Sequence, residues 1–500
     1  MKGTRVLGYS AIAALGLVSA LVAAGCGGPS TGAGRAAETF SPTVRSTSVP
    51  AEINPMLGVR TYAAGQHVAY AVERDGKTQV YVDGQPVARP YDGCTLVEFD
   101  SLGRHFYFGG KVGPRWYLIR DGTETTELGS LTSLDRIGVG GDSDASSEPS
   151  RYFLSIRIPQ LSIWFARDSE SYFALAYQNQ TGRVLRDGAW LPLKYDSFYH
   201  KAMAISSDGS HVVLGVTSSD TGQAGIYLDG KRIAQGRADF AAFLSPNSRV
   251  VYRVAPEDDD TGSVFDGENR LLGYEAVLPG VVTSPDMSRL AAVSTKHPGK
   301  QAVIVGGVEE SAFDEVLWEN RTQVSSFVWN RLGTSHAYVV RDGKQMRVVH
   351  DGKALDPHEE IAVGRLAISD DGKHLAYGVM ESGKYAVVAD GKMQERYAWI
   401  GRMVWDATGS RLYYPAKRAD GWIVKGLDNG RSFTDIGWMR ASPGGVVFAG
   451  KSGDGTWQVY VNGRSVSSSY EVVHDLAVDG HGVVRFAGRT NSSVDWVVTR

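Results

Sequence analysis

Cysteine is scarce in this sequence, because only Cys26 and Cys94 occur among 500 residues. Two cysteines cannot build a disulfide framework. A basic excess is also missing, since 52 Lys and Arg residues stand against 55 Asp and Glu residues and the formal net charge is −3. Nucleic-acid binding calls for a basic excess on the folded part, so no nucleic-acid partner is expected.

Long apolar runs are missing as well. The run from about Ala11 to Ala24 is shorter than the ~20 residues that a membrane span needs. It follows a basic start with Lys2 and Arg5, and small residues come after it, which is the order of a secretory signal. Residues 1–25 are therefore predicted to be a signal peptide, and their removal changes the formal charge from −3 to −5, because Lys2 and Arg5 leave with it.

The residues before Cys26 read Leu21-Val22-Ala23-Ala24-Gly25. This segment resembles the lipobox of bacterial lipoproteins, in which a cysteine is acylated and becomes the new N-terminus. The resemblance implies an exported protein with a lipid, such as palmitate, at Cys26, anchored in the cell envelope on its periplasmic or outer face. The alternative is an ordinary signal peptide cut near Ala24, with Cys26 a bystander.

The residues that follow Cys26 are rich in Gly, Ser, Thr and Pro and have few large apolar groups to bury. We expect residues 26–47 to form a flexible tether. Cys94 then remains alone, and we interpret it as a partly buried small hydrophobe rather than a reactive thiol.

Glycine is abundant, with 60 residues in the chain, and an internal repeat of about 39 residues runs from about residue 59 to the end. Its clearest copy starts at Ile368-Ser369-Asp370-Asp371-Gly372 and reads as four short strands joined by turns. The second turn of the repeat is an Asp-Gly, Asn-Gly or Gly-Gly pair, which tolerates the positive φ angles of a type I′ hairpin. Ten such pairs occur in phase, at 83–84, 121–122, 187–188, 229–230, 266–267, 306–307, 351–352, 390–391, 429–430 and 462–463.

An aromatic residue often returns seven or eight residues after the second turn. We expect it to pack the outer strand of one unit onto the next unit. The residues in question are Tyr91, Tyr195, Tyr274, Phe313, Tyr397 and Tyr470.

This repeat predicts an all-β chain folded as a β-propeller of four-stranded blades, with about eleven repeats. That number exceeds the ~4 to 8 blades of typical propellers, so we expect two tandem rings of five or six blades over residues 48–278 and 279–500. One large ring is the alternative. The last repeat lacks its outer strand, and the segment Ser48–Met56 is the predicted donor that closes the ring. Residues 139–161 read as either a long loop or a decayed blade.

Three first-turn segments carry a family resemblance. They read Ser245-Pro246-Asn247-Ser248, Ser284-Pro285-Asp286 and Ser369-Asp370-Asp371-Gly372, and each precedes a short apolar strand. They resemble the Ser-Pro-Asp-Gly repeats of TolB-type, WD-repeat-like propellers. The resemblance implies architecture, since such propellers occur in scaffolding, peptide-binding and hydrolase-associated settings.

Several motifs that imitate functional sites are interpreted as structural. Residues Gly445–Ser452 match the letters of a phosphate loop, but their interior is apolar and no helix signal follows, so a strand is predicted. His358-Glu359-Glu360 begins like a zinc-protease helix, but Ala362 stands where the second histidine belongs. Five histidines occupy one phase of the repeat, which indicates a repeated structural role; they are His67, His105, His211, His336 and His374.

No Gly-x-Ser-x-Gly nucleophile motif follows the signal region, and no catalytic, metal-binding or cofactor-binding residue is predicted. The hypothesis from sequence is a lipid-anchored binding or scaffold module for an envelope protein, a peptide or another ligand, bound at a ring face or in the channel. The alternative is a propeller enzyme of lyase or glycosidase type whose acidic residues converge in the channel.

Overall fold

The structure is a computed structural model. It describes residues 42–48, 59–61, 67–129, 133–137, 155–159, 162–178, 181–245, 248–256, 259–318, 326–427, 430–490 and 493–499. These residues form strands β1 to β47 and the turns between them. Within these ranges, no helix is long and apolar enough to cross a membrane.

The first four blades follow one another along the chain. Blade 1 consists of β2 (Val59–Thr61), β3 (Val68–Arg74), β4 (Lys77–Val82) and β5 (Gln85–Tyr91). Blade 2 consists of β6 (Gly93–Cys94), β7 (Glu98–Phe99), β8 (Phe106–Val112), β9 (Arg115–Arg120) and β10 (Thr123–Gly129). Blades 3 and 4 share one seven-stranded sheet of β13 (Ser162–Phe165), β14 (Tyr172–Gln178), β15 (Thr181–Arg186), β16 (Ala189–Ile205), β17 (Val212–Ser218), β18 (Ala224–Leu228) and β19 (Lys231–Gln235).

Blades 5 to 8 repeat the same pattern. Blade 5 consists of β20 (Arg237–Leu244), β21 (Arg249–Ala255), β22 (Ser263–Asp266) and β23 (Asn269–Arg270). Blade 6 consists of β24 (Val282–Thr283), β25 (Leu290–Ser294), β26 (Gln301–Val305) and β27 (Val308–Phe313). Blade 7 consists of β28 (Glu315–Val316), β29 (Val328–Trp329), β30 (His336–Asp342), β31 (Gln345–His350) and β32 (Lys353–Ala354). Blade 8 consists of β33 (Glu360–Ile368), β34 (Leu375–Glu381), β35 (Lys384–Ala389) and β36 (Lys392–Tyr397).

The last three blades complete the repeat. Blade 9 consists of β37 (Trp399–Ile400), β38 (Val404–Trp405), β39 (Leu412–Arg418) and β40 (Gly421–Lys425). Blade 10 consists of β41 (Asp435–Ser442), β42 (Gly445–Lys451), β43 (Trp457–Val461) and β44 (Arg464–Ser465). Blade 11 consists of β45 (Val472–Val478), β46 (Val484–Arg489), β47 (Ser493–Thr499) and β1 (Pro42–Ser48). The described residues thus form an all-β propeller, as the repeat predicts, with eleven blades.

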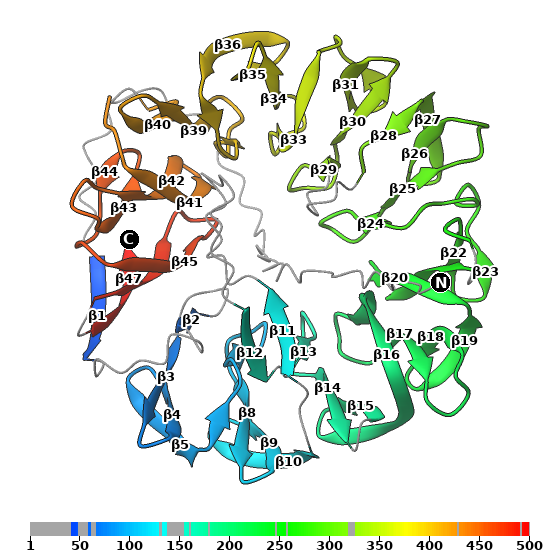
Figure 1. The fold of residues 1–500 in the computed structure, drawn as a ribbon, viewed down its shortest axis with the longest axis vertical. Helices are drawn as coiled ribbons and strands as arrows, with labels where there is room; N and C mark the ends of the chain where they lie inside the picture. Colours follow the sequence, from blue (N-terminus) through cyan, green and yellow to red (C-terminus); the bar gives the residue numbers. More distant parts are fainter. Residues whose placement is uncertain are drawn as a thin grey trace, which may run out of the picture.

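Each blade runs outward, with its first strand nearest the middle of the ring and its last strand at the outer rim (Figure 1). Neighbouring strands in a blade are antiparallel, so the turns after the first and third strands lie at one end of the blade. We call this side of the ring the hairpin face; in blade 8 it carries Asp371-Gly372 and Asp390-Gly391. The opposite face carries the turn between the second and third strands, which is Ser382-Gly383 in blade 8.

The predicted type I′ turns are confirmed in most blades. Both turn residues have positive φ at 83–84, 121–122, 187–188, 229–230, 306–307, 351–352, 390–391 and 462–463. At Asp266 the turn is shifted by one residue, because Asp266 pairs with Asn269 and positive φ falls on Gly267. Asn429 lies outside the described residues.

The first turns are fixed by short side-chain hydrogen bonds. In blade 8 the Ser369 hydroxyl donates to the Asp371 carboxylate at 2.6 Å and accepts from the His374 backbone N–H at 3.0 Å. The hydrogen bonds from Ser369 and from the Lys373 backbone lower the pKa of Asp371 to about 2. The same bond joins Ser206 to Asp208 in blade 4, and Ser284 bonds Asp286 in blade 6, so this local bonding explains why Ser and Asp recur at the first turn.

Apolar packing continues around one ring. Within the described residues, eleven clusters of buried side chains each join two neighbouring blades. One cluster joins blade 5 to blade 6 through Val251 and Ile304, across the predicted boundary at 278 and 279. Another joins blade 11 to blade 1 through Trp496 and Tyr70. The expected division into two rings is therefore wrong, and the alternative of one large ring is what the packing forms, because each blade buries its apolar faces on the blades before and after it.

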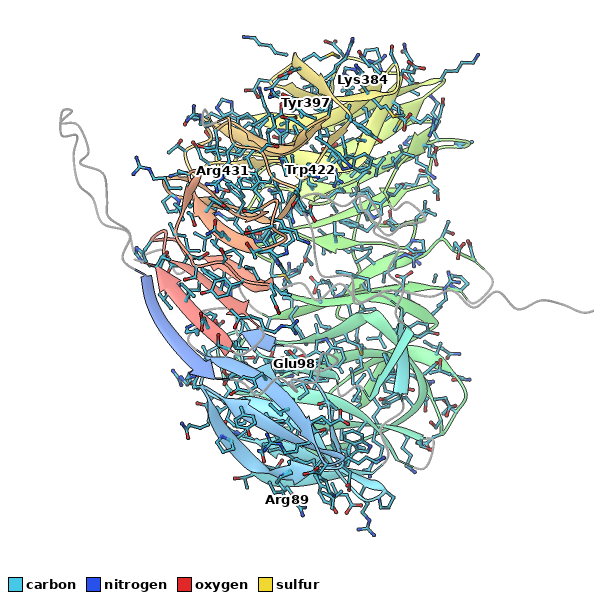
Figure 2. All side chains as sticks on the ribbon, turned by 60° about the vertical axis from the view of Figure 1, so that its left-hand side comes forward. Arg89, Glu98, Lys384, Tyr397, Trp422 and Arg431 are labelled. Carbon is cyan, nitrogen blue, oxygen red and sulfur yellow. The ribbon has the colours of Figure 1, made fainter. Side chains whose placement is uncertain are left out.

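The ring is closed by a strand from the N-terminal side, as predicted, but the donor segment differs. Strand β1 (Pro42–Ser48) pairs with β47 along its whole length, from Pro42 opposite Thr499 to Ser48 opposite Ser493. Figure 2 shows the blue β1 lying alongside the red β47. The predicted donor Ser48–Met56 contains Pro50 and Pro55, which have no N–H for a hydrogen-bond ladder, whereas β1 has a proline only at its first residue. The tether predicted over residues 26–47 is accordingly wrong for residues 42–47, which form part of β1.

The segment 139–161 lies partly outside the described residues. Its described part, β12 (Ser155–Pro159), pairs with β11 (Ser133–Ile137) as a two-stranded hairpin. The described portion of this insert is therefore not a four-stranded blade.

The returning aromatics do what the sequence predicts. Each of them is buried and belongs to a cluster that contains residues of the next blade. In blade 11 the ring of Tyr470 lies against Gly488, where an added Cβ would meet the ring atoms at 2.5 Å. Glycine at this position thus lets the aromatic ring of blade 10 approach the backbone of blade 11 closely.

Candidate functional site: a cleft between blades 7 and 8

One register position of the blade departs from the repeat in blade 7. The residue four positions before the end of the third strand, or three positions in blade 9, pairs with an aromatic residue in six blades. These aromatic residues are Tyr91, Tyr195, Phe313, Tyr397, Phe433 and Tyr470. In blade 7 the residue at this position is Met346, and its partner is His358. A histidine thus takes the place of the aromatic residue that packs one blade on the next.

A cleft opens beside this histidine. Its volume is about 720 Å³, and it lies between the outer strands of blades 7 and 8 at their hairpin ends. This volume falls in the range of small-ligand sites, which is ~300–1,000 Å³. Blade 7 contributes His350, Lys353, Ala354, Leu355, Asp356 and His358, and blade 8 contributes Lys373, His374, Leu375, Tyr377, Val388, Asp390, Gly391 and Met393.

The floor of the cleft is apolar, and it contains the Tyr377 hydroxyl, which contacts His358. Leu375, Tyr377 and Val388 are all buried. The Tyr377 hydroxyl lies 3.1 Å from Nε2 of His358, whose Nδ1 is 3.9 Å from Oε1 of Glu381. Burial and the nearby charge of Asp356 raise the pKa of Tyr377 to about 12. At neutral pH the cleft therefore presents a neutral phenol on its floor.

The rim carries groups of both charges. Lys353 and Asp356 are exposed, and neither forms an ion pair with any residue that the structure describes. Lys373 is 3.4 Å from the Asp371 carboxylate and its side chain is 78% exposed. Met393 adds an apolar side chain that is 42% exposed. A ligand entering the cleft thus meets charged and apolar contacts at the rim and an apolar surface below.

The histidines that share one phase of the repeat have the predicted structural role. Each contacts the aspartate of the hairpin turn in its own blade. Nδ1 lies 2.6 to 2.8 Å from the carboxylate in the pairs His67 with Asp83, His105 with Asp121, His211 with Asp229 and His374 with Asp390. His336 contacts Asp351 in the same way, at 3.2 Å between Nδ1 and Oδ1. His374 in the cleft therefore follows the repeat and is not particular to this site.

Ser335, His350 and Asp351 lie close together beside the cleft, which His350 lines, but they lack the arrangement of a proton relay. The Ser335 hydroxyl is 3.0 Å from Nε2 of His350 and donates to Oδ2 of Asp351 at 2.7 Å. The same Oδ2 is 3.6 Å from Nε2 of His350, whereas a relay needs the carboxylate on Nδ1. Ser335 is also buried. Burial lowers the pKa of His350. This set fixes the hairpin turn of blade 7.

The other residues that were singled out from the sequence lie away from the cleft or outside the described residues. Cys26, the predicted lipidation site, lies outside the described residues. Cys94 is buried between blades 1 and 2, and burial raises the pKa of its thiol to about 12. Residues Gly445–Lys451 form the buried strand β42, as predicted. Among the described residues, no group of three or more His, Cys, Asp or Glu side chains is placed to hold a metal ion.

The cleft itself was missed by the sequence prediction, although a signal for it is present. The aromatic residue recurs seven or eight residues after the second turn, and His358 stands seven residues after Asp351. The units that follow Asp121, Asp229 and Asn429 also lack the aromatic residue, but they have leucine, glycine and isoleucine seven residues after the turn, whereas the blade 7 unit has a histidine. That histidine is the signal for the interface between blades 7 and 8. The lining residues from blade 8 have no local signal, because they meet blade 7 only in the folded ring.

Fold and cleft together define a large single-ring β-propeller with a ligand-sized cleft between two blades. No protein-family model and no curated protein matches this chain. Solved structures with similarity include a eukaryotic initiation factor, with 11% identity over 64% of this chain and 90% of that chain and a TM-score of 0.37. The Dos1 propeller is 10% identical over 68% of this chain and 92% of that chain, with a TM-score of 0.31. Hydrazine synthase of Kuenenia stuttgartiensis is 11% identical over 53% of this chain and 95% of that chain, with a TM-score of 0.25. Likeness at this level says nothing about function.

Proposed function

We propose that this chain is an extracytoplasmic lipoprotein whose propeller binds a segment of an envelope protein in the cleft between blades 7 and 8. The observation that carries the proposal is His358, because it replaces an interblade aromatic and leaves a cleft with an apolar floor and a rim of both charges. Apolar pockets with a few polar groups are the usual form of ligand sites. A rim with Lys353 and Asp356 suits a polypeptide that carries both charges.

Binding without catalysis is supported by the partners of the reactive groups. His358 is engaged with Tyr377, His374 with Asp390 and His350 with Ser335. A general base needs a free nitrogen within reach of the proton it takes. One ring nitrogen of each of these histidines is in contact with a neighbouring side chain, and the contact of His358 with Tyr377 joins the two blades, which favours a binding role.

The lipid anchor is supported by the signal sequence and by the path of the chain. Pro42 pairs with Thr499, and β47 ends on the hairpin face, where the turn to an outer strand would follow. Pro42, the first residue of β1, therefore lies at the hairpin face of blade 11. An anchor at Cys26 would then hold the membrane near the face on which the cleft opens.

The anchor is tested by replacing Cys26 with serine and fractionating cells. We expect wild-type protein in the membrane fraction and the C26S variant in the soluble exported fraction. A variant changed at the other cysteine, Cys94→Ala, should stay in the membrane fraction. Membrane attachment of C26S that resists salt extraction would contradict the proposed anchor.

The binding site is tested by in-cell photo-crosslinking from two exposed apolar positions. A photoreactive amino acid at Met393, on the rim of the cleft, should capture an envelope protein. The same amino acid at Leu272, which is 84% exposed in blade 5, serves as the matched control. Capture at Met393 should fall at least about tenfold when Lys353→Glu and Asp356→Lys reverse the rim charges, a loss of ~1.4 kcal/mol or more. Equal capture from both positions, or capture that ignores the rim charges, would contradict a site in the cleft.

A further inference from the structure

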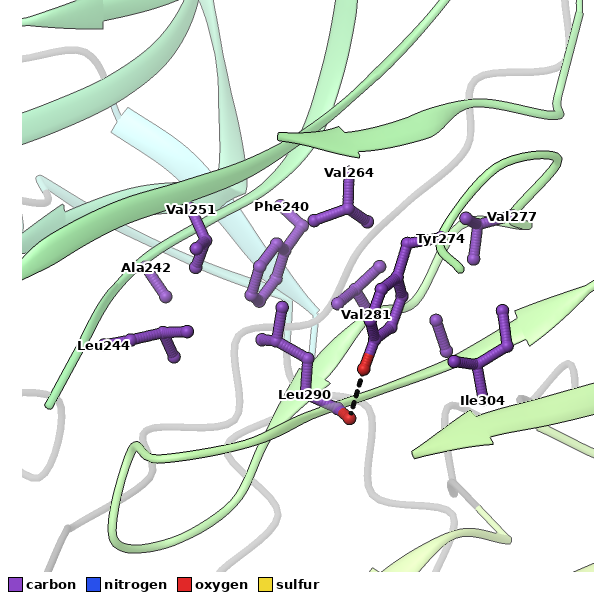
Figure 3. Packing of buried hydrophobic residues seen from close by; sticks show 11 residues of the cluster. Phe240, Ala242, Leu244, Val251, Val264, Tyr274, Val277, Val281, Leu290 and Ile304 are labelled. Atoms are coloured by element: carbon purple, nitrogen blue, oxygen red, sulfur yellow. Dashed lines mark hydrogen bonds between the residues drawn. The ribbon is translucent and has the colours of Figure 1, made fainter. Parts of the chain in front are cut away.

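The interface between blades 5 and 6 shows how the ring fills the space that is open between blades 7 and 8. Blade 5 also lacks an aromatic at the register position, where Val277 pairs with Gly262. Tyr274 fills the interface instead and is only 2% exposed. Its hydroxyl donates to the Leu290 carbonyl at 2.8 Å, as Figure 3 shows, and accepts from the Gly307 N–H at 3.0 Å.

The two backbone groups that bind this hydroxyl have counterparts in the cleft. Leu290 and Leu375 are the first residues of the second strands of blades 6 and 8. Gly307 and Gly391 are the second residues of the hairpin turns in the same blades, and the first turn residue donates to the leucine carbonyl at 2.9 Å in both. Leu375 and Gly391 both line the cleft. The cleft thus has the same carbonyl acceptor and N–H donor that the Tyr274 hydroxyl uses in the interface between blades 5 and 6.

Blade 7 has a shorter chain at the equivalent position. The chain from the end of the third strand to the bridge residue runs from Asp266 to Val277 in blade 5, but only from His350 to His358 in blade 7. The three additional residues of blade 5 bring in Tyr274. A Cβ on Gly307 would meet the Leu272 carbonyl at 3.8 Å, whereas a Cβ on Gly391 would meet nothing within 4 Å. The hairpin turn of blade 8 is thus left uncovered by blade 7.

We infer that the cleft receives a tyrosine side chain from the bound polypeptide, which supplies the phenol that blade 5 provides from its own chain. This inference rests on the proposed function and deepens it by naming the side chain recognised. The phenol ring packs on Val388 and Tyr377, and its hydroxyl bonds the Leu375 carbonyl and the Gly391 N–H. Lys353 and Asp356 then lie beside the backbone that flanks the tyrosine.

The inference is tested with purified protein and N-acetyl-tyrosinamide as the probe, observed by ligand-detected NMR. We expect binding with a Kd on the order of 1 mM, as befits so small a ligand. N-acetyl-phenylalaninamide should bind at least about tenfold more weakly, because its ring covers the Gly391 N–H without bonding it and adds no second bond to the Leu375 carbonyl, which already accepts from Asp390. Equal affinity for the two probes, or no binding of the tyrosine probe, would overturn the inference.

A loop graft locates the bound probe. Replacing Asp356-Pro357 of blade 7 by the blade 5 segment Leu272–Ala276 should place a tyrosine in the cleft and abolish binding of the probe. The same graft with alanine in place of its tyrosine should retain binding. Probe binding that persists in the tyrosine graft would overturn the inference, and so would loss of binding in both grafts when both melt as cooperatively as wild type.

The inference and the proposed function fail in different ways. If Met393 captures an envelope protein through the rim charges while N-acetyl-tyrosinamide does not bind, the proposed function stands and the tyrosine inference falls. If the probe binds and both grafts behave as expected while no partner is captured at Met393, the cleft recognises phenols but the envelope-protein ligand is wrong.

Discussion

His336 shows at the scale of one residue how a repeated position acquires a local property. Its ring is buried, with Nε2 at 2.9 Å from Oε1 of Glu310 in blade 6. Tyr338 donates to the other oxygen of Glu310 at 2.8 Å. Burial by itself lowers the pKa of His336, but the bonds with Asp351 and Glu310 outweigh it and raise the pKa above its ordinary value. The imidazole therefore links blades 6 and 7, and its contact with Glu310 favours the charged form.

This link predicts a pH dependence of stability. Because the pKa of His336 is raised in the folded state, its contribution is complete below pH ~6.5, the ordinary histidine pKa, and is lost as the pH rises through the raised value. We expect His336→Gln to lower the melting temperature by about 3 °C at pH 6. The difference from wild type should shrink towards pH 9, as measured by calorimetry.

His350 gives a control of opposite sign. Burial lowers its pKa, so its contribution is present above pH ~6.5 and is lost as the pH falls. The deficit of His350→Gln should therefore shrink at acid pH. A deficit of His336→Gln that is constant between pH 6 and pH 9 would show that the imidazole charge has no part in joining the blades.

At the scale of elements, β1 is the strand on which ring closure depends. It is the outer strand of blade 11 and pairs with β47 through seven residue pairs. Its place in the sequence is far from β47, so loop closure between the chain ends must occur before this pairing forms. An open ring would leave the edge of β47 unpaired.

Deleting residues 42–48 removes β1 and should therefore leave the outer edge of β47 unpaired. We expect amide hydrogens of β46 and β47 to exchange at least about 100-fold faster, which corresponds to a local loss of ~2.7 kcal/mol. Hydrogen exchange followed by mass spectrometry measures this, with β34 in blade 8 as the internal reference.

The matched control removes the same number of residues, 27–33, ahead of the strand. This deletion should leave exchange in blade 11 unchanged. Equal protection of β47 in both deletions would mean that β1 does not close the ring.

Strand β16 shows what pairing decides beyond the turn signals. It runs for 17 residues, pairing with β15 in its first part and with β17 in its second. The repeat predicts an outer strand of blade 3 and an inner strand of blade 4 here. It does not predict that one continuous strand serves as both. The sequence between Tyr195 and Ile205 has no glycine or proline, so no turn signal shows whether the chain breaks there into two strands or continues as one.

At the scale of the whole molecule, the single ring predicts that neither half of the chain is an independent domain. Residues 42–278 expressed alone would expose the blade 5 face of one cluster and the blade 1 face of another. We expect this fragment, and residues 279–500, to aggregate or to lack near-UV circular dichroism, because each leaves two apolar blade faces in water. Two monomeric fragments with cooperative melting would contradict the single ring.

The sequence by itself determined the local structure of this protein. Turn pairs such as Asp390-Gly391 fix hairpins through positive φ, and the Ser369 and Asp371 side chains fix the first turn. The blades and their approximate number therefore follow from contacts between residues that are close in the sequence. The buried role of Tyr470 and the structural role of His374 follow from the same periodicity.

Tertiary structure decided what depends on distant partners. One ring or two depends on which blade faces meet, and every blade carries similar apolar faces, so the repeat is compatible with either. The choice of β1 over Ser48–Met56 depends on a full ladder with β47 at the other end of the chain. The cleft exists because His358 of blade 7 meets Tyr377 of blade 8, and only the packed interface turns this departure from the repeat into a site.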